Sequence, residues 1–155
     1  MDGVVQSVLS GNIRPNGFVK LDTFGLAGPP LEWDIGASGS DDHVRANLVG
    51  SAQRRAAEKY GTPFTCENTV LVGDTPDDVR TGLDGGAKVV AVATGSDDAD
   101  TLAGAGADVV LPALTETASF LAAIKQMLRT GCAMTPYPDD MRPGLMLREA
   151  PALDR

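Results

Sequence analysis

The chain has little of the side-chain chemistry on which many enzymes and binding proteins depend. Its 155 residues contain one histidine, His43, and two cysteines, Cys66 and Cys132, which stand far apart in the sequence. This scarcity argues against a zinc site of the CxxC type, and against a metal centre or catalytic triad that needs several histidines. Two isolated cysteines favour a reducing compartment, so we expect a cytoplasmic protein.

Positive charge and long apolar runs are also scarce. Lys and Arg number 13 against 21 for Asp and Glu, which gives a net charge of -8 at pH 7. We expect neither nucleic acid nor a membrane as a partner, because both attract basic surfaces. No run approaches the roughly 18 apolar residues of a membrane span, and residues 1–3 lack the basic and apolar regions of a signal peptide.

The length and the composition are those of one domain. A chain of 155 residues has the commonest domain size, and 43% hydrophobic residues is ordinary for a globular protein. Beyond Thr130 every periodic pattern is interrupted by prolines, namely Pro136, Pro138, Pro143 and Pro151. We predict a core domain over residues 1–129 and a poorly ordered tail over residues 130–155.

Apolar runs and helical patterns alternate along the core domain. Strands are predicted over residues 4–9, 31–35, 70–72, 88–93 and 108–111. Helices are predicted over residues 18–24, 41–60, 79–83 and 116–129, with a loop and a short helix over 95–106 and a turn over 36–40. This order predicts an α/β protein with a Rossmann-like, mostly parallel sheet and helices on both faces.

Two of these helices carry an apolar face at helical spacing. In residues 41–60 the positions predicted to face the core are Val44, Leu48, Ala52 and Ala56. In residues 116–129 they are Phe120, Leu121, Ile124, Met127 and Leu128. We expect both helices to cover the sheet, because an apolar stripe needs a partner surface.

The most informative segment is the acidic turn after the apolar run 70–72. Asp74 follows the run directly, and Asp77 and Asp78 come after Pro76, which suits the first position of a helix. Parallel sheets bind ligands at the carboxyl ends of their strands, and Mg²⁺ takes one or two protein carboxylates. We predict a Mg²⁺ site at Asp74, helped by Asp78. The alternative is an acidic helix start without a ligand.

Three segments, in order along the chain, resemble motifs of the haloacid dehalogenase (HAD) superfamily of hydrolases, most closely the phosphoglycolate phosphatase-type branch. Residues 8–12, Val-Leu-Ser-Gly-Asn, resemble the second motif, a strand that ends in Ser or Thr. Lys20 matches the lysine of the third motif, and residues 73–78, Gly-Asp-Thr-Pro-Asp-Asp, match the acidic fourth motif. The resemblance extends over roughly residues 4–128.

The resemblance implies a Mg²⁺-dependent phosphatase that acts on small phosphorylated metabolites. Ser10, with the backbone N–H groups of Gly11 and Asn12, would bind the phosphate, and Lys20 would supply positive charge beside it. Ser10 and Lys20 would thus be catalytic residues. The metal ligands implied are Asp74 and Asp78.

One part of the HAD pattern is not found in the 155 residues. Family members carry an apolar strand that ends in Asp-x-Asp, whose first carboxylate attacks phosphorus and whose second protonates the leaving group. The first apolar run here, residues 4–9, already matches the second motif, and the inserted cap domain that largely sets substrate specificity is not found either. We therefore expect a partial, truncated HAD-like core that is inactive alone.

In HAD family members, the strand that ends in Asp-x-Asp lies between the strands that correspond here to the runs 4–9 and 70–72. These two runs should either pair directly or leave a slot with unpaired backbone groups. A complementing N-terminal segment, or self-association, would fill such a slot. If the chain is active alone, Asp2 or Asp41 is the nearest substitute nucleophile.

Two other functions stay open. One is a catalytically inactive module that still binds Mg²⁺ and phosphate and has a regulatory role. The other is an unrelated flavodoxin-like or response-regulator-like α/β binding module. Phosphatase activity measured with and without an added nucleophile strand distinguishes the catalytically inactive module from a hydrolase. Mg²⁺ binding that survives replacement of both Asp74 and Asp78 favours the unrelated α/β module.

Overall fold

A computed structural model describes residues 3–132, in which strands and helices alternate as predicted. The elements are β1 (Leu9–Ser10), α1 (Arg14–Thr23), the 3-10 helix η1 (Trp33–Ile35), β2 (Ala37–Ser38), α2 (Arg45–Tyr60), β3 (Val70–Gly73), α3 (Pro76–Gly85), β4 (Lys88–Val92), α4 (Ala99–Gly104), β5 (Val109–Leu111) and α5 (Thr117–Met127). The predicted α/β class is confirmed. No helix in this part of the chain combines the length and the apolar character that crossing a membrane requires.

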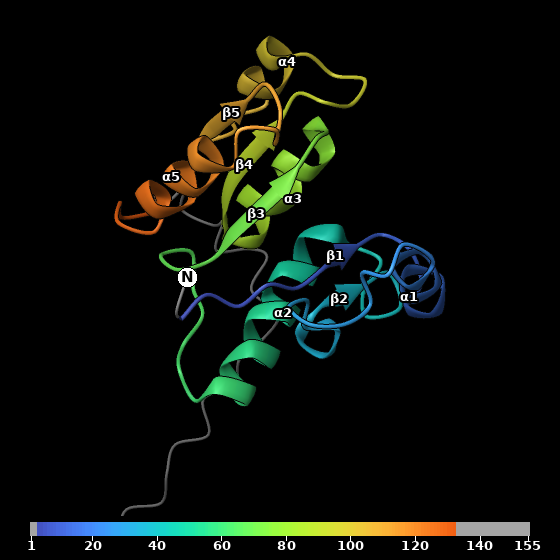
Figure 1. Cartoon of the computed structure of the whole chain (residues 1–155). Helices are drawn as coiled ribbons and strands as arrows, with labels where there is room; N and C mark the ends of the chain where they lie inside the picture. Colours follow the sequence, from blue (N-terminus) through green and yellow to red (C-terminus); the bar gives the residue numbers. More distant parts are fainter. Residues whose placement is uncertain (1–2, 133–155) are drawn as a thin grey trace, which may run out of the picture.

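The strands form two small parallel sheets rather than one. β1 pairs with β2, and β4 lies between β3 and β5 in a second sheet. Within the described residues, β1 has no neighbour besides β2, and β3 has none besides β4. The runs 4–9 and 70–72 therefore do not close on each other. Helix α2 connects the two sheets, since it packs on β1 and β2 and also on α3 (Figure 1).

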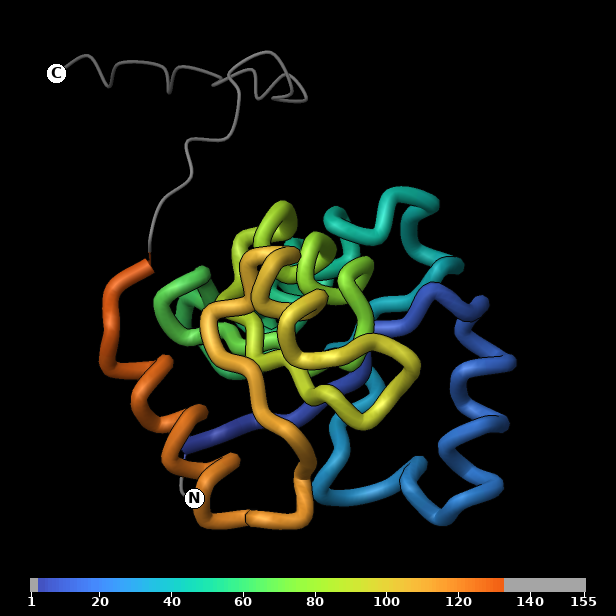
Figure 2. The backbone as a smooth tube through the Cα atoms, turned by 90° about the horizontal axis from the view of Figure 1, so that it is seen from above, coloured from blue at the N-terminus to red at the C-terminus, as the bar shows by residue number. Residues whose placement is uncertain are grey.

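The core surrounds β4, which is buried along its whole length. Successive side chains of a strand point to opposite faces, so a strand that is apolar from Val89 to Val92 needs cover on both. On one face of β4, Val89 and Ala91 pack with Val79 of α3 and Leu102 of α4. On the other face, Val90 packs with Ile124 and Met127 of α5. Seen from above, α5 and α1 lie at opposite sides of the molecule (Figure 2).

The long helices begin and end at different residues from those predicted. Helix α2 starts at Arg45 rather than at residue 41, because the Asp42 carboxylate accepts the backbone N–H of Val44 in a turn. Val44, predicted to lie in the core, is 43% exposed. Helix α5 ends at Met127, so Leu128 is also exposed rather than buried.

The prediction of a strand over residues 31–35 is wrong. Residues 33–35 form η1, and β2 lies within residues 36–40, where a turn is predicted. Two close approaches of the backbone explain the difference. A Cβ on Gly36 would lie 2.6 Å from the Val8 carbonyl oxygen, and one on Gly39 would lie 2.4 Å from that of Gly11. The glycines permit pairing with β1, where composition alone suggests a turn.

The division between core and tail stays a prediction. Most of the tail predicted from residue 130 lies outside the described residues. Thr130 and Cys132, which are described, both contact the core. The run 4–9 is also shorter as a strand than predicted, since only Leu9 and Ser10 pair continuously and Gln6 forms an isolated bridge with Leu31.

Candidate functional site

The residues predicted to bind phosphate lie together in the turn after β1. The Ser10 hydroxyl oxygen accepts hydrogen bonds from the Asn12 backbone N–H at 3.2 Å and from the Asn12 side-chain amide at 3.1 Å. The Asn12 side-chain oxygen accepts a hydrogen bond from the Lys20 ammonium at 3.4 Å. We call residues 10–12 the β1 turn. Within the described residues, the Ser10 O–H makes no donor contact, so it is available to a ligand.

Helix α1 brings Lys20 to this turn, and Trp33 of η1 fixes the helix in place. A Cβ on Gly17 would lie 2.9 Å from the Trp33 ring, so the glycine allows the helix to rest directly on the indole. Phe18 packs edge-on against Trp33, with ring centroids 5.9 Å apart, and the Arg14 guanidinium lies 5.3 Å from the centre of the same ring. Lys20 is thus presented from a packed helix.

A second turn, between β3 and α3, carries the predicted metal ligands. Thr75 caps α3, because its hydroxyl accepts the Asp78 backbone N–H at 3.1 Å and donates to an Asp78 carboxylate oxygen at 2.8 Å. A Cβ on Gly73 would lie 2.4 Å from the Asp78 Cβ, so the last residue of β3 has to be glycine for Asp78 to fold back over it. We call residues 73–78 the acidic turn.

Asp74 and Asp78 have different surroundings in the acidic turn. The Asp74 carboxylate is exposed and lies over Gly95, where an added Cβ would come within 2.8 Å of one of its oxygens. In the described part of the chain, this carboxylate makes no hydrogen bond or ion pair. Asp78 uses one oxygen for Thr75 and the other for an arginine. Asp74 is therefore the carboxylate that is free to bind a ligand.

The arginine is Arg45, the first residue of α2. It donates to an Asp77 oxygen at 2.8 Å and to an Asp78 oxygen at 2.7 Å. The same guanidinium lies against the β1 turn, 4.0 Å from where a Cβ on Gly11 would be, and its buried Nε has no hydrogen-bond partner within the described residues. Arg45 thus brings the β1 turn and the acidic turn into one site.

Arg45 is a site residue that the sequence motifs did not predict, although its position in the first turn of a helix is unusual for a cation. A cation in the first turn of a helix is disfavoured by the helix dipole, so an arginine there needs a compensating partner. The partners come from α3, more than 30 residues further along the chain. The spacing of motifs does not show such a contact.

Asp41 supports the end of β2. Its carboxylate accepts two hydrogen bonds from the Arg55 guanidinium and two from Ser38, one each from the backbone N–H and the hydroxyl. The bonds from Arg55, followed by those from Ser38, hold the pKa of Asp41 well below its ordinary value. Both oxygens are engaged, which argues against Asp41 as a substitute nucleophile. Asp2, the other candidate, lies outside the described residues.

The donor set fits a magnesium ion held mainly by one protein carboxylate. No group of three or more His, Cys, Asp or Glu side chains in residues 3–132 is arranged to hold a metal. Mg²⁺ requires only one or two carboxylates and takes its other ligands from water and phosphate oxygens. Asp74 meets this requirement, and Asp78 lies one helical turn away, where it could orient a bound water.

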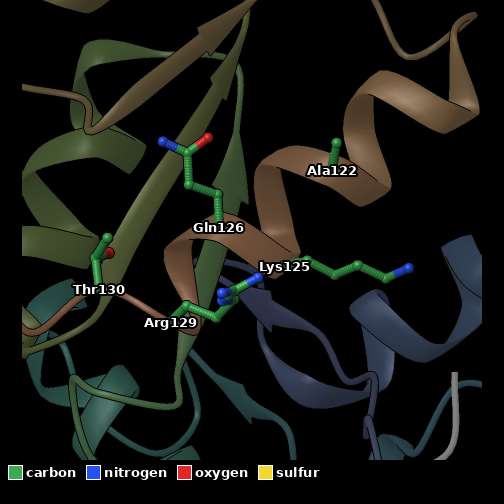
Figure 3. A pocket seen from close by; sticks show the side chains of 5 residues that line it. All are labelled: Ala122, Lys125, Gln126, Arg129 and Thr130. Atoms are coloured by element: carbon green, nitrogen blue, oxygen red, sulfur yellow. The ribbon is translucent and has the colours of Figure 1, made fainter.

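A shallow hollow on α5 does not belong to this site. It is lined by Ala122, Lys125, Gln126, Arg129 and Thr130, as Figure 3 shows. The carbonyl oxygen of Thr130 accepts a hydrogen bond from Lys88, the first residue of β4. The hollow is therefore near the amino end of the sheet, whereas the acidic turn follows the carboxyl end of β3.

Solved structures with the same fold include two named as hydrolases or phosphatases. A predicted phosphatase from Clostridium acetobutylicum is 19% identical, with a TM-score of 0.59 over 78% of this chain and 53% of that one. A HAD family hydrolase from Deinococcus radiodurans R1, with bound phosphate and sodium, is 23% identical, with a TM-score of 0.56 over 82% and 54%. A putative beta-phosphoglucomutase from Bacteroides vulgatus is 14% identical, with a TM-score of 0.55 over 73% and 52%.

Residues 47–117, which include β3 and the whole acidic turn, match the HAD-hydrolase-like family. This segment is similar to the HAD-hydrolase-like family, and the described chain shares the fold of the solved structures above. The match favours the HAD-like alternative over an unrelated flavodoxin-like module. The chain spans about half the length of the solved structures that it matches, and no curated protein matches it.

Proposed function

We propose that this chain supplies the phosphate- and metal-binding half of a Mg²⁺-dependent hydrolase of small phosphate monoesters. The observation that carries the proposal is the position of Arg45, which lies between the donors of the β1 turn and the carboxylates of the acidic turn. Phosphoryl transfer needs donors and positive charge around the phosphate oxygens. The Deinococcus radiodurans neighbour, solved with bound phosphate and sodium, gives further support.

Each residue of the site has a role in this proposal. The Ser10 hydroxyl and the Gly11 backbone N–H donate hydrogen bonds to phosphate oxygens. The Asn12 backbone N–H, also predicted to bind phosphate, donates to Ser10 instead, so Asn12 holds Ser10 and Lys20 in position. Lys20 and Arg45 offset the negative charge of the substrate. Asp74, with support from Asp78, would hold Mg²⁺, which when bound would neutralise charge on a phosphate oxygen.

The group that attacks phosphorus is not among these residues. We propose that an apolar strand ending in Asp-x-Asp lies between β1 and β3 and comes from a segment outside this sequence or from a second chain. Within the described residues, β1 pairs only with β2 and β3 only with β4. Each of these strands therefore has an edge with unpaired backbone groups, which supports an additional neighbour there.

The test is hydrolysis of p-nitrophenyl phosphate with Mg²⁺, by the 155-residue chain alone and with a peptide that carries an apolar strand and an Asp-x-Asp pair. Alone, the chain should fall far below the ordinary enzymatic turnover of about 1 s⁻¹, because loss of a nucleophile costs about 10⁶ in a well-studied protease. The peptide should restore Mg²⁺-dependent turnover, and an Asn-x-Asn peptide, the matched control, should not. Turnover by the chain alone that is lost in Asp74→Asn and in Lys20→Ala would contradict the proposal.

A second candidate is a module that binds Mg²⁺ and phosphate without catalysis. The observation that favours it is that Arg45 engages both Asp77 and Asp78, which leaves Asp74 as the one free carboxylate of the acidic turn. In this case Mg²⁺ and phosphate should bind, and no peptide should restore hydrolysis. The phosphoglycolate phosphatase-type branch and the cytoplasmic location stay predictions.

A further inference from the structure

The two cysteines, far apart in the sequence, meet at one corner of the fold. Cys66 lies in the loop before β3, and Cys132 follows the end of α5. Their Cα atoms are 6.0 Å apart and their sulfur atoms form a disulfide. The residues between them contain the whole β3–β4–β5 sheet together with α3, α4 and α5. The disulfide therefore closes a loop around the entire second sheet.

The buried side chain of Lys88 forms hydrogen bonds to the same two segments. Its side chain belongs to β4, and the residue is 3% exposed. The ammonium donates to the carbonyl oxygen of Glu67, next to Cys66, at 3.0 Å, and to those of Met127 and Thr130 at the end of α5. Three carbonyls satisfy the three donors of an ammonium, and a cation is favourable at a helix C-terminus. The covalent bond and this polar cluster thus hold one corner together.

We propose that Cys66 and Cys132 are a redox-responsive clasp that fixes the end of α5 to the loop before β3. Both cysteines are only partly buried, so a small disulfide of the glutathione class can reach them. One protein thiolate attacks a sulfur of that disulfide and releases one thiol, and the second cysteine then displaces the other. In total, two protein thiols lose two electrons and two protons, and two small thiols are formed. The reverse exchange opens the clasp.

The hydrogen bonds of Lys88 determine how reduction of the disulfide affects the end of α5. Once the disulfide is reduced, Lys88 still binds the end of α5, so the helix stays docked but is released more often. Because the constraint on the unfolded chain is gone, the second sheet also unfolds at a lower temperature. The clasp is at the amino end of β3 and the acidic turn at its carboxyl end, so this inference does not depend on the proposed function.

The first experiment titrates the whole 155-residue chain in buffers of reduced and oxidised glutathione, with thiols counted by maleimide labelling and mass spectrometry. Both cysteines should react together in one two-electron step within a monomer. Thermal unfolding of the oxidised chain should lie about 5–15 °C above that of the reduced chain. Two thiols that stay free in oxidised glutathione, or equal unfolding temperatures, would overturn the proposal.

The matched variants are Cys66→Ser and Cys132→Ser, both of which should unfold at the reduced temperature in either buffer. Hydrogen exchange gives an independent measurement on the wild-type chain if a variant folds poorly. Among amides that exchange by local opening, reduction should speed exchange in the last turn of α5 about tenfold or more, and should change exchange in α3 much less. Exchange that speeds up equally in both helices, or in neither, would contradict a clasp at this corner.

Discussion

Arg45 donates a hydrogen bond of 2.7 Å to Asp78, 33 residues further along the chain. The same guanidinium binds Asp77 and lies against the backbone of the β1 turn. One side chain thus joins two turns that belong to different sheets. An arginine can do this because its planar group presents several donors in a fixed geometry. The candidate site depends on this contact more than on any single motif.

Replacement of Arg45 by methionine should destabilise the chain by about 1 kcal/mol, because Asp77 and Asp78 lose their shared partner at a position that water partly reaches. Urea unfolding measures the change. The matched control is Arg54→Met on an exposed face of the same helix, where within residues 3–132 the guanidinium makes one hydrogen bond, to the Ser51 hydroxyl at 3.5 Å, and no ion pair. An equal loss in both variants would show that the Arg45 contact contributes nothing specific.

Mg²⁺ binding should depend on Asp74. Isothermal titration of the wild-type chain should give weak binding, because one free carboxylate supplies few protein ligands. Asp74→Asn should weaken it about tenfold or more, and Asp78→Asn should have a smaller effect. Asp84→Asn, which changes an exposed carboxylate at the other end of α3, is the control and should leave the affinity unchanged. Equal affinities for Asp74→Asn and Asp84→Asn would refute the site.

Gly73→Ala should disturb the acidic turn, because the new methyl group would lie 2.4 Å from the Asp78 Cβ. We expect a loss of about 2 kcal/mol or more in urea unfolding, together with weaker Mg²⁺ binding. Gly104→Ala is the matched control, since its Cβ would meet nothing within 4 Å at the end of α4. That variant should be neutral or slightly more stable. A neutral Gly73→Ala would mean that the turn can relax around Asp78.

The stability of the chain should depend on the protonation of Asp41 in acid. Hydrogen bonds from Arg55 and Ser38 lower the pKa of Asp41 in the folded state. Because the pKa is lower in the folded state, the carboxylate stabilises the fold at pH values above about 3.9, the pKa of Asp in an unfolded chain. This stabilisation is lost as the pH falls from there toward the pKa of the folded state. Asp41→Asn should therefore cost about 1–3 kcal/mol at pH 7 and progressively less below about pH 4.

The measurement for Asp41 is urea unfolding of wild type and variant between pH 7 and pH 3. Asp22→Asn, at an exposed position of α1, serves as the control and should show no such convergence with wild type. If the difference between wild type and Asp41→Asn stayed constant over this range, the carboxylate of Asp41 would not be held as the structure shows.

The sequence by itself determined the α/β class, the strands β3, β4 and β5, and the acidic turn. These features depend on local patterns. An apolar run such as residues 89–93 favours a covered strand, and Gly73 and Pro76 mark where one element stops and the next begins. The grouping of Ser10, Asn12 and Lys20 also followed from the order of motifs, because a short turn and the helix after it remain close in space.

Only the tertiary structure decided the rest, because the contacts involved join residues far apart in the sequence. Ala37 and Ser38 form a strand only because β1 lies beside them and glycines allow the approach. Arg45 faces the acidic turn because α2 packs on α3, and Cys66 meets Cys132 because α5 folds back along the sheet. Local propensity carries no information on such pairings, since their free energy is gained only when the distant segments pack together.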